Sequence, residues 1–332
     1  MSESTAKRTY GLLDVVKFIM SIFVITIHRR IGSDSNFLIF EEVNVLARLA
    51  VPFFFTSSSF LFFSKLNRVE NRSYAFEKYE FRLLRLFVIW NLIYIPSSIY
   101  RAKFYFKYSW TETISEILHF SNHLWFLPVL AMSVAAIYYG VQKKPKITGI
   151  VSAVLFILSI LAGFGKFYLH NPTDTVYFLL SGIPYVFLGY LIAGGKKIAS
   201  LKASVIIFAV SIILSLTEGY IEFNFLENTY FGFSRLFYLP AIYSLISICL
   251  NVQTKERKIF LTLRKLSMFI YFIHLIVYQE MIWLLFHIAG FDELYKNNFT
   301  VFVFTLFYVA AACILLLLLE DKKGFRWLKN LY

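Results

Sequence analysis

Ten apolar windows, each long enough to cross a bilayer as a helix, cover most of the chain. A membrane-spanning helix needs about 20 predominantly apolar residues. Of the 332 residues, 58% are hydrophobic and only 16% are charged, which excludes a soluble globular enzyme. The sequence therefore predicts an all-α integral membrane protein with about ten transmembrane helices around a polar cavity. No loop is long enough for a second domain, so we predict one transmembrane domain over residues 1–332. The windows are 11–30, 37–64, 81–100, 122–142, 147–165, 175–194, 201–217, 233–251, 266–289 and 299–319.

The basic residues are distributed unevenly between alternate loops. The chain has 33 lysines and arginines against 20 acidic residues, a net charge of +13. The two ends and every second loop hold 23 of these cations, and the intervening loops hold 7. Because positively charged short loops stay in the cytoplasm, both ends, residues 1–10 and 320–332, are predicted to be cytoplasmic. Orientation thus accounts for the charge, and no nucleic-acid partner is expected. Cys249 and Cys313 lie inside apolar windows and indicate neither a redox pair nor a metal site.

The first window carries ionisable residues along one helical face. Asp14, Lys17, Ser21 and His28 are spaced by 3, 4 and 7 residues, which places them on one side of a helix. Ionisable side chains at membrane depth are costly and usually face a cavity or a partner. A snorkelling Asp14–Lys17 pair and a headgroup-anchoring His28 are the alternatives. The functional interpretation is that His28 is a general base, since an imidazole titrates near pH 6.5.

Two further arginine positions stand out. Arg82 and Arg85, at i and i+3, lie at the predicted cytoplasmic start of the third helix. Paired guanidinium groups suit phosphate, although cations flank the cytoplasmic ends of most membrane helices. Arg235 has no acidic neighbour in the sequence and therefore needs either a carboxylate from another helix or an anionic ligand.

Together, these motifs and their order resemble the membrane-bound acyltransferase 3 family. The opening helix is similar to the family's L-D-x-x-R…H pattern, with Lys17 where arginine is usual. Residues 51–62 resemble P-x-F-F-x-x-S-G-[FY]-L, with Ser59 in place of glycine. The other similar segments are Arg82 to Arg85 (R-x-x-R), His123 to Leu127 (H-L-W-F-L), Pro184 to Leu191 (F-x-x-G-x-x) and Ser267 to His274 (S-x-x-I-Y-x-x-H).

The resemblance implies a bacterial cytoplasmic-membrane O-acyltransferase. Its donor would be cytoplasmic acyl-coenzyme A, with acetyl favoured and succinyl left open, and its acceptor would be a hydroxyl of an extracytoplasmic glycan or glycolipid. Arg82 and Arg85 would bind the phosphates of coenzyme A, while His28, Lys17 and Asp14 would serve catalysis. We expect no metal and no extracytoplasmic hydrolase-like domain. Membrane lipid is the surrounding partner, and a homo-oligomer is left open. The residues expected to line the substrate cavity are Ser58, Ser59, Trp125, Arg235 and His274.

Two other functions fit the same sequence features. A secondary transporter or flippase for a glycan or lipid-linked anion would also have ten helices and buried arginine and histidine. The windows show no inverted repeat and no matched pair of interrupted helices, which favours the enzyme. A non-catalytic subunit with the same fold would have no need to keep the ionisable positions together.

Overall fold

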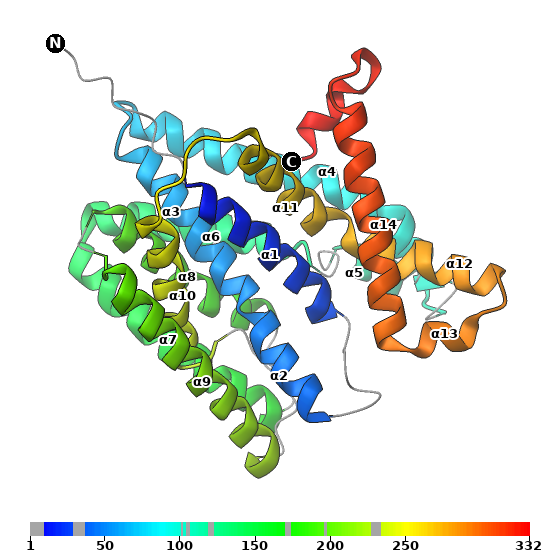
Figure 1. Ribbon diagram of the computed structural model, residues 1–332, viewed down its shortest axis with the longest axis horizontal. Coiled ribbons are helices and arrows are strands. Elements are labelled where there is room, and N and C mark those ends of the chain that lie inside the picture. The colour runs from blue at the N-terminus through cyan, green and yellow to red at the C-terminus, as the bar shows by residue number, and fades with distance from the viewer. Residues whose placement is uncertain are drawn as a thin grey trace.

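The computed structural model describes residues 10–28, 37–100, 102–103, 107–118, 123–169, 174–195, 198–226 and 234–332 (Figure 1). Within these ranges every regular element is helical, as the sequence predicts. The elements are α1 (Gly11–His28), α2 (Phe37–Arg48), α3 (Ala50–Leu66), α4 (Arg72–Tyr100), α5 (Trp110–Leu118), α6 (Phe126–Lys143), α7 (Pro145–Leu169), α8 (Asp174–Ala193), α9 (Leu201–Leu226), α10 (Tyr238–Asn251), α11 (Lys258–Ile276), the π-helix η2 (Val277–Ile282), α12 (Trp283–Ile288), α13 (Asp292–Lys296), α14 (Asn298–Leu319) and the 3-10 helix η3 (Lys323–Asn330).

Among the described residues, eight helical segments are long and apolar enough to cross a membrane. The other two apolar segments, Leu180–Ala193 in α8 and Tyr238–Asn251, are shorter. At 1.5 Å per residue the 14 residues of α10 extend about 21 Å, less than the roughly 30 Å of a hydrocarbon core. The structure thus establishes a multi-pass membrane protein, and the count of ten spans stays a prediction.

The outer helices expose apolar side chains and bury small polar ones. Only 11% of the spanning window of α7 is buried, and its exposed residues repeat at helical spacing. Ser152 and Ser159, by contrast, point inward and are buried. An apolar outer face is what a lipid-facing helix requires. The exposed large apolar residues are Ile147, Ile150, Val151, Val154, Ile157, Leu158 and Leu161.

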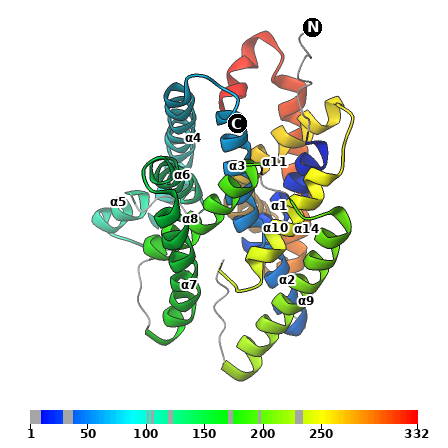
Figure 2. The same ribbon diagram turned by 90° about the vertical axis from the view of Figure 1, so that its left-hand side faces the viewer.

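Helix α3 joins two groups of helices. Figure 2 shows α4, α5, α6, α7 and α8 on one side of α3, and α1, α2, α9, α10, α11 and α14 on the other. The span that contains α3 is 67% buried, and α3 packs against α8 in the first group and against α1 and α10 in the second. A buried central helix with one face toward each group can line a space between them.

Two helix boundaries differ from the sequence prediction. The second window is interrupted at Leu49, because Pro52 has no N–H to donate to the carbonyl of Arg48 and its ring crowds that carbonyl. The third helix begins at Arg72, about three turns before Arg82. Its first turns are held by aromatic packing, with Tyr79 4.4 Å from Phe62 between ring centroids.

The start of α1 and the C-terminal segment lie at the same face, beside the start of α11. The backbone N–H of Gly11 donates to Thr254 Oγ1, which precedes α11, at 2.9 Å. After α14, Glu320 accepts hydrogen bonds from Lys265 at 2.7 Å and from the hydroxyl of Tyr332. The two ends of the described chain therefore lie at the same face of the molecule. A protein with both ends in the cytoplasm would need this arrangement. The orientation itself remains a prediction.

Candidate functional site

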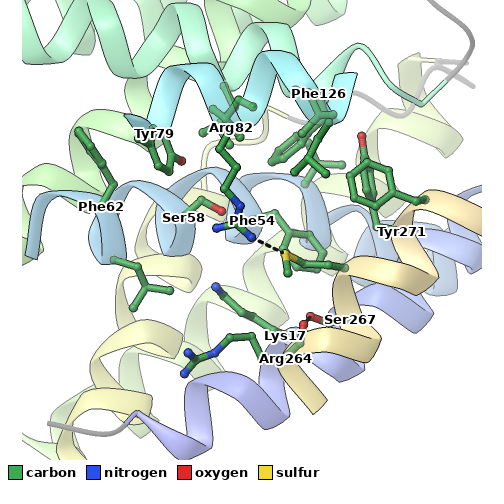
Figure 3. A pocket seen from close by; sticks show the side chains of 18 of the residues that line it. Lys17, Phe54, Ser58, Phe62, Tyr79, Arg82, Phe126, Arg264, Ser267 and Tyr271 are labelled. Carbon is green, nitrogen blue, oxygen red and sulfur yellow. Dashed lines mark hydrogen bonds between the residues drawn. The ribbon is translucent and has the colours of Figure 1, made fainter. Parts of the chain in front are cut away.

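A cavity of about 580 Å³ lies between the two groups of helices. Its wall is built by α1, α3, α4, α6 and α11, and Figure 3 shows side chains from several of these helices converging on it. The volume is within the range of small-molecule sites. Segments from opposite ends of the sequence thus line one site.

One end of the cavity is strongly basic. Five cations line it, Lys17, Lys65, Lys78, Arg82 and Arg264. In Figure 3 the guanidinium group of Arg82 points past Ser58 toward the amine of Lys17, with Arg264 beyond it. Like charges that converge on one space attract an anion, and guanidinium groups suit phosphate in particular.

Arg264 already has an acidic partner. Its Nε and Nη2 atoms each donate to a carboxylate oxygen of Asp14 at 2.8 Å, a bidentate ion pair. The side chain of Asp14 is only 3% exposed, so this pair satisfies a buried carboxylate. Among the described residues, none of the other four cations at the basic end forms a salt bridge. The Nη2 atom of Arg82 donates a hydrogen bond to Met268 Sδ at 3.8 Å.

Aromatic side chains line the cavity on both sides of Arg82. In Figure 3, Phe126 and Tyr271 lie on one side of Arg82, and Phe62 and Tyr79 lie on the other. The ring of Phe126 is 4.5 Å from that of Phe55 and 5.8 Å from that of Tyr271, between centroids. These rings leave a mainly apolar passage between the basic end and the far end of α1.

Three histidines come together at the other end. The ring of His274 is 5.1 Å from that of His28 and 4.9 Å from that of His123, between centroids. The hydroxyl of Tyr271 donates to the backbone carbonyl of His123 at 2.7 Å, which ties the start of α6 to α11. Eleven residues of α1, about 16 Å, separate Lys17 from His28. The basic and histidine ends are thus joined by one helix face.

The structure brings most of the predicted site residues to this cavity. Lys17 and His28 of α1, Ser58 of α3, Arg82 of α4 and Trp125 line it directly. Asp14 is held beside it through Arg264, and His274 is buried behind His28.

Three predicted site residues lie elsewhere. Arg85 is exposed and does not line the cavity. Ser59, expected in the cavity, is turned toward α8, because it is one residue past Ser58 and therefore about 100° around the helix. Its hydroxyl donates to the carbonyl of Thr56 at 3.0 Å. Arg235 forms a 2.6 Å ion pair with Glu222 of α9, so of the two partners left open by the sequence it has the carboxylate of another helix.

Sequence reasoning missed Arg264 and His123 as site residues. Arg264 was counted among the cations of a cytoplasmic loop, yet it lies on α11, three residues before the segment Ser267 to His274 that carries the family resemblance. A buried Asp14 was the signal that a cation had to come from another helix. His123, for its part, is an ionisable residue at the edge of a predicted span.

Metal ligation has no support in the described residues, where no three His, Cys, Asp or Glu side chains are placed to hold an ion. The three neighbouring histidines, His28, His123 and His274, do not form such a group either.

The fold and cavity define a multi-pass membrane protein with one buried, two-ended polar site. A profile described as an acyltransferase domain, that of the acyltransferase 3 family, matches residues 10–318. The chain belongs to this family and is therefore assigned as an acyltransferase.

One curated relative is an amino-acid racemase from Enterococcus faecalis, 26% identical over 163 residues. The match covers 47% of this chain and 22% of the relative, so the chain spans about a fifth of that protein's length. At this coverage the racemase name says nothing about the reaction of this chain. No solved structure matches the chain.

Proposed function

We propose that this protein transfers an acyl group, acetyl in the first instance, from cytoplasmic acyl-coenzyme A to a hydroxyl of an extracytoplasmic glycan or glycolipid at a bacterial cytoplasmic membrane. The observation that carries the proposal is the two-ended cavity, with cations at one end and histidines at the other. A donor with a phosphorylated head and a long arm suits this arrangement. Its phosphates would lie among Lys17, Arg82 and Arg264, and its thioester would reach toward His28.

The chemistry needs one base and one leaving group. A nitrogen of neutral His28 accepts the proton of the acceptor hydroxyl while the hydroxyl oxygen attacks the thioester carbonyl. The new C–O bond forms, the C–S bond breaks, and the thiolate of coenzyme A takes up the proton from His28. The wall near His28 is built by Val24, Ile27 and Val51. A small uncharged acyl group suits these apolar side chains better than succinyl, whose free carboxylate would be desolvated against them.

The decisive test is His28→Ala in proteoliposomes supplied with acetyl-coenzyme A and acceptor glycan. We expect the rate of coenzyme A release to fall by about 10²–10⁴, the usual contribution of a histidine base, without a change in melting temperature. His287→Ala is the matched control, because His287 is exposed on α12 and stacks on Trp283 outside the cavity. Near wild-type release from His28→Ala would refute the assigned base.

A second measurement tests the reaction itself. Mass spectrometry of surface glycans from a strain lacking the protein should show the loss of one acyl mass increment, which identifies both acyl group and acceptor. Movement of the acceptor across the membrane without thioester consumption would overturn the enzyme in favour of a transporter.

A further inference from the structure

The environment of His274 determines which of its ring nitrogens carries hydrogen. Nδ1 lies 2.8 Å from the carbonyl oxygen of Tyr271 and 3.1 Å from that of Ile270. Carbonyl oxygens only accept hydrogen bonds, so Nδ1 is the protonated nitrogen. In the neutral ring Nε2 then holds the lone pair and is an acceptor.

That acceptor is buried without a hydrogen-bond partner among the described residues. His274 is 1% exposed, and its Nε2 atom has no donor in reach. A buried acceptor left without a hydrogen bond is destabilising, and such an atom in a native structure calls for an explanation. The donor that satisfies Nε2 has to come from a neighbouring side chain or from a bound molecule.

The side chains around His274 limit which group can donate a hydrogen bond to its Nε2 atom. His28 of α1 is 5.1 Å from the His274 ring, His123 is 4.9 Å away and Tyr271 is 6.5 Å away, between centroids. The hydroxyl of Tyr271 is already donated to a backbone carbonyl. Arg48 of α2 is the charged group that acts electrostatically on His28. Both histidines line the cavity, but of the two only His28 lies on α1, the helix that also carries Lys17.

We propose that His274 is a positioning residue for His28. In the reacting complex Nε2 of His274 accepts the N–H of His28, which fixes the other ring nitrogen of His28 as the lone pair that removes the acceptor's proton. A centroid separation of 5.1 Å fits two imidazoles that meet edge to edge. Only a rotation of the His28 side chain is needed, and catalytic hydrogen bonds often tighten when substrate binds. This inference rests on the proposed function.

The proton balance leaves His274 unchanged. The hydroxyl proton moves to His28 and then to the departing thiolate, while Nδ1 of His274 keeps its hydrogen throughout. During the step His28 is an imidazolium, and the Nε2 lone pair of His274 accepts from it and stabilises its charge. The role resembles that of the orienting group in a catalytic triad, here performed by a neutral ring.

Two substitutions separate this role from simple packing. His274→Gln places an amide oxygen near the position of Nε2, where it can still accept from His28. His274→Asn keeps a donor near the position of Nδ1 but does not reach His28. We expect kcat to fall about 10–100-fold in His274→Asn and less than about fivefold in His274→Gln, with the KM for acetyl-coenzyme A unchanged in both because the basic end is intact. Equal kcat in His274→Asn and wild type would overturn the proposal.

A spectroscopic measurement needs no turnover, and its one variant, His28→Ala, serves only to assign the signal. In ¹⁵N-histidine-labelled protein saturated with coenzyme A, solid-state NMR should show a single tautomer for His28. A mixture of tautomers in the wild-type protein would overturn the proposal even if His274→Asn does not fold. The proposed function fails separately, by full activity of His28→Ala.

Discussion

Replacing Gly189 with alanine is expected to force α3 and α8 apart. A Cβ atom at residue 189 would lie 1.9 Å from Ser59 Oγ, 2.4 Å from the carbonyl oxygen of Thr56 and 2.8 Å from the backbone N of Phe60. The serine hydroxyl can rotate away, but the two backbone atoms cannot. The close approach of these helices therefore depends on a residue without a side chain.

The distances give the size of the effect. Ordinary contact begins at 3.4 Å, so the carbonyl of Thr56 and the new Cβ atom must separate by about 1 Å. Overpacking of this kind typically costs about 1–3 kcal/mol, and alanine returns at most about 1 kcal/mol through its helix propensity. We expect a net loss of about 1–2 kcal/mol. The shift also reaches the cavity, because Phe54 and Ser58 line it from the opposite side of α3.

The assay is the melting temperature of the purified protein in detergent. Gly194→Ala is the matched control, since its Cβ atom would meet nothing closer than the carbonyl of Leu191 at 3.4 Å. Adding Ser59→Ala to Gly189→Ala removes only the hydroxyl contact, so most of the loss should persist. A wild-type melting temperature for Gly189→Ala, or full recovery in the double variant, would refute the reasoning.

Two more predictions concern the basic end and the C-terminal segment. Arg82→Gln should raise the KM for acyl-coenzyme A about tenfold or more, whereas Arg85→Gln should raise it less, because only Arg82 lines the cavity; equal effects in steady-state kinetics would contradict this. Burial opposes ionisation of Glu320, but hydrogen bonds from Lys265 and Tyr332 outweigh it and lower its pKa below the ordinary 4.5. The contact therefore stabilises the segment above about pH 4.5 and loses that effect as the pH falls through the lowered pKa. The protection factor for amide hydrogen exchange near Tyr332 should fall in acid in the wild type and be low already at neutral pH in Glu320→Gln; identical protection factors in both proteins would exclude the effect.

The sequence predicts what depends on local spacing. The polar face of α1 follows from residues 3, 4 and 7 apart, and the apolar windows locate most helices because length and hydropathy suffice for a bilayer. The start of α4 was missed because its first turns are charged and are held by aromatic contacts such as Phe62 with Tyr79. Hydropathy does not record such packing.

Contacts between helices that are distant in the sequence could not be predicted for a different reason. Ser58 and Ser59 are adjacent and chemically identical, and only the position of α8 decides which one faces the cavity. Arg264 was indistinguishable from the cations that mark cytoplasmic loops. Its role is defined by Asp14, on a helix at the other end of the chain, and a single sequence gives no sign of that pairing.

The ion pair between Asp14 and Arg264 also has a consequence for biosynthesis. The two residues are 250 positions apart, and at about 5–20 residues per second Arg264 is synthesised roughly 12–50 s after Asp14. In that interval the cation nearest to Asp14 along α1 is Lys17, one turn away. We therefore expect a newly inserted α1 to hold both charges as a local pair until α11 supplies Arg264 to the carboxylate. On this expectation Lys17 becomes available to the cavity only after about four fifths of the chain has been synthesised.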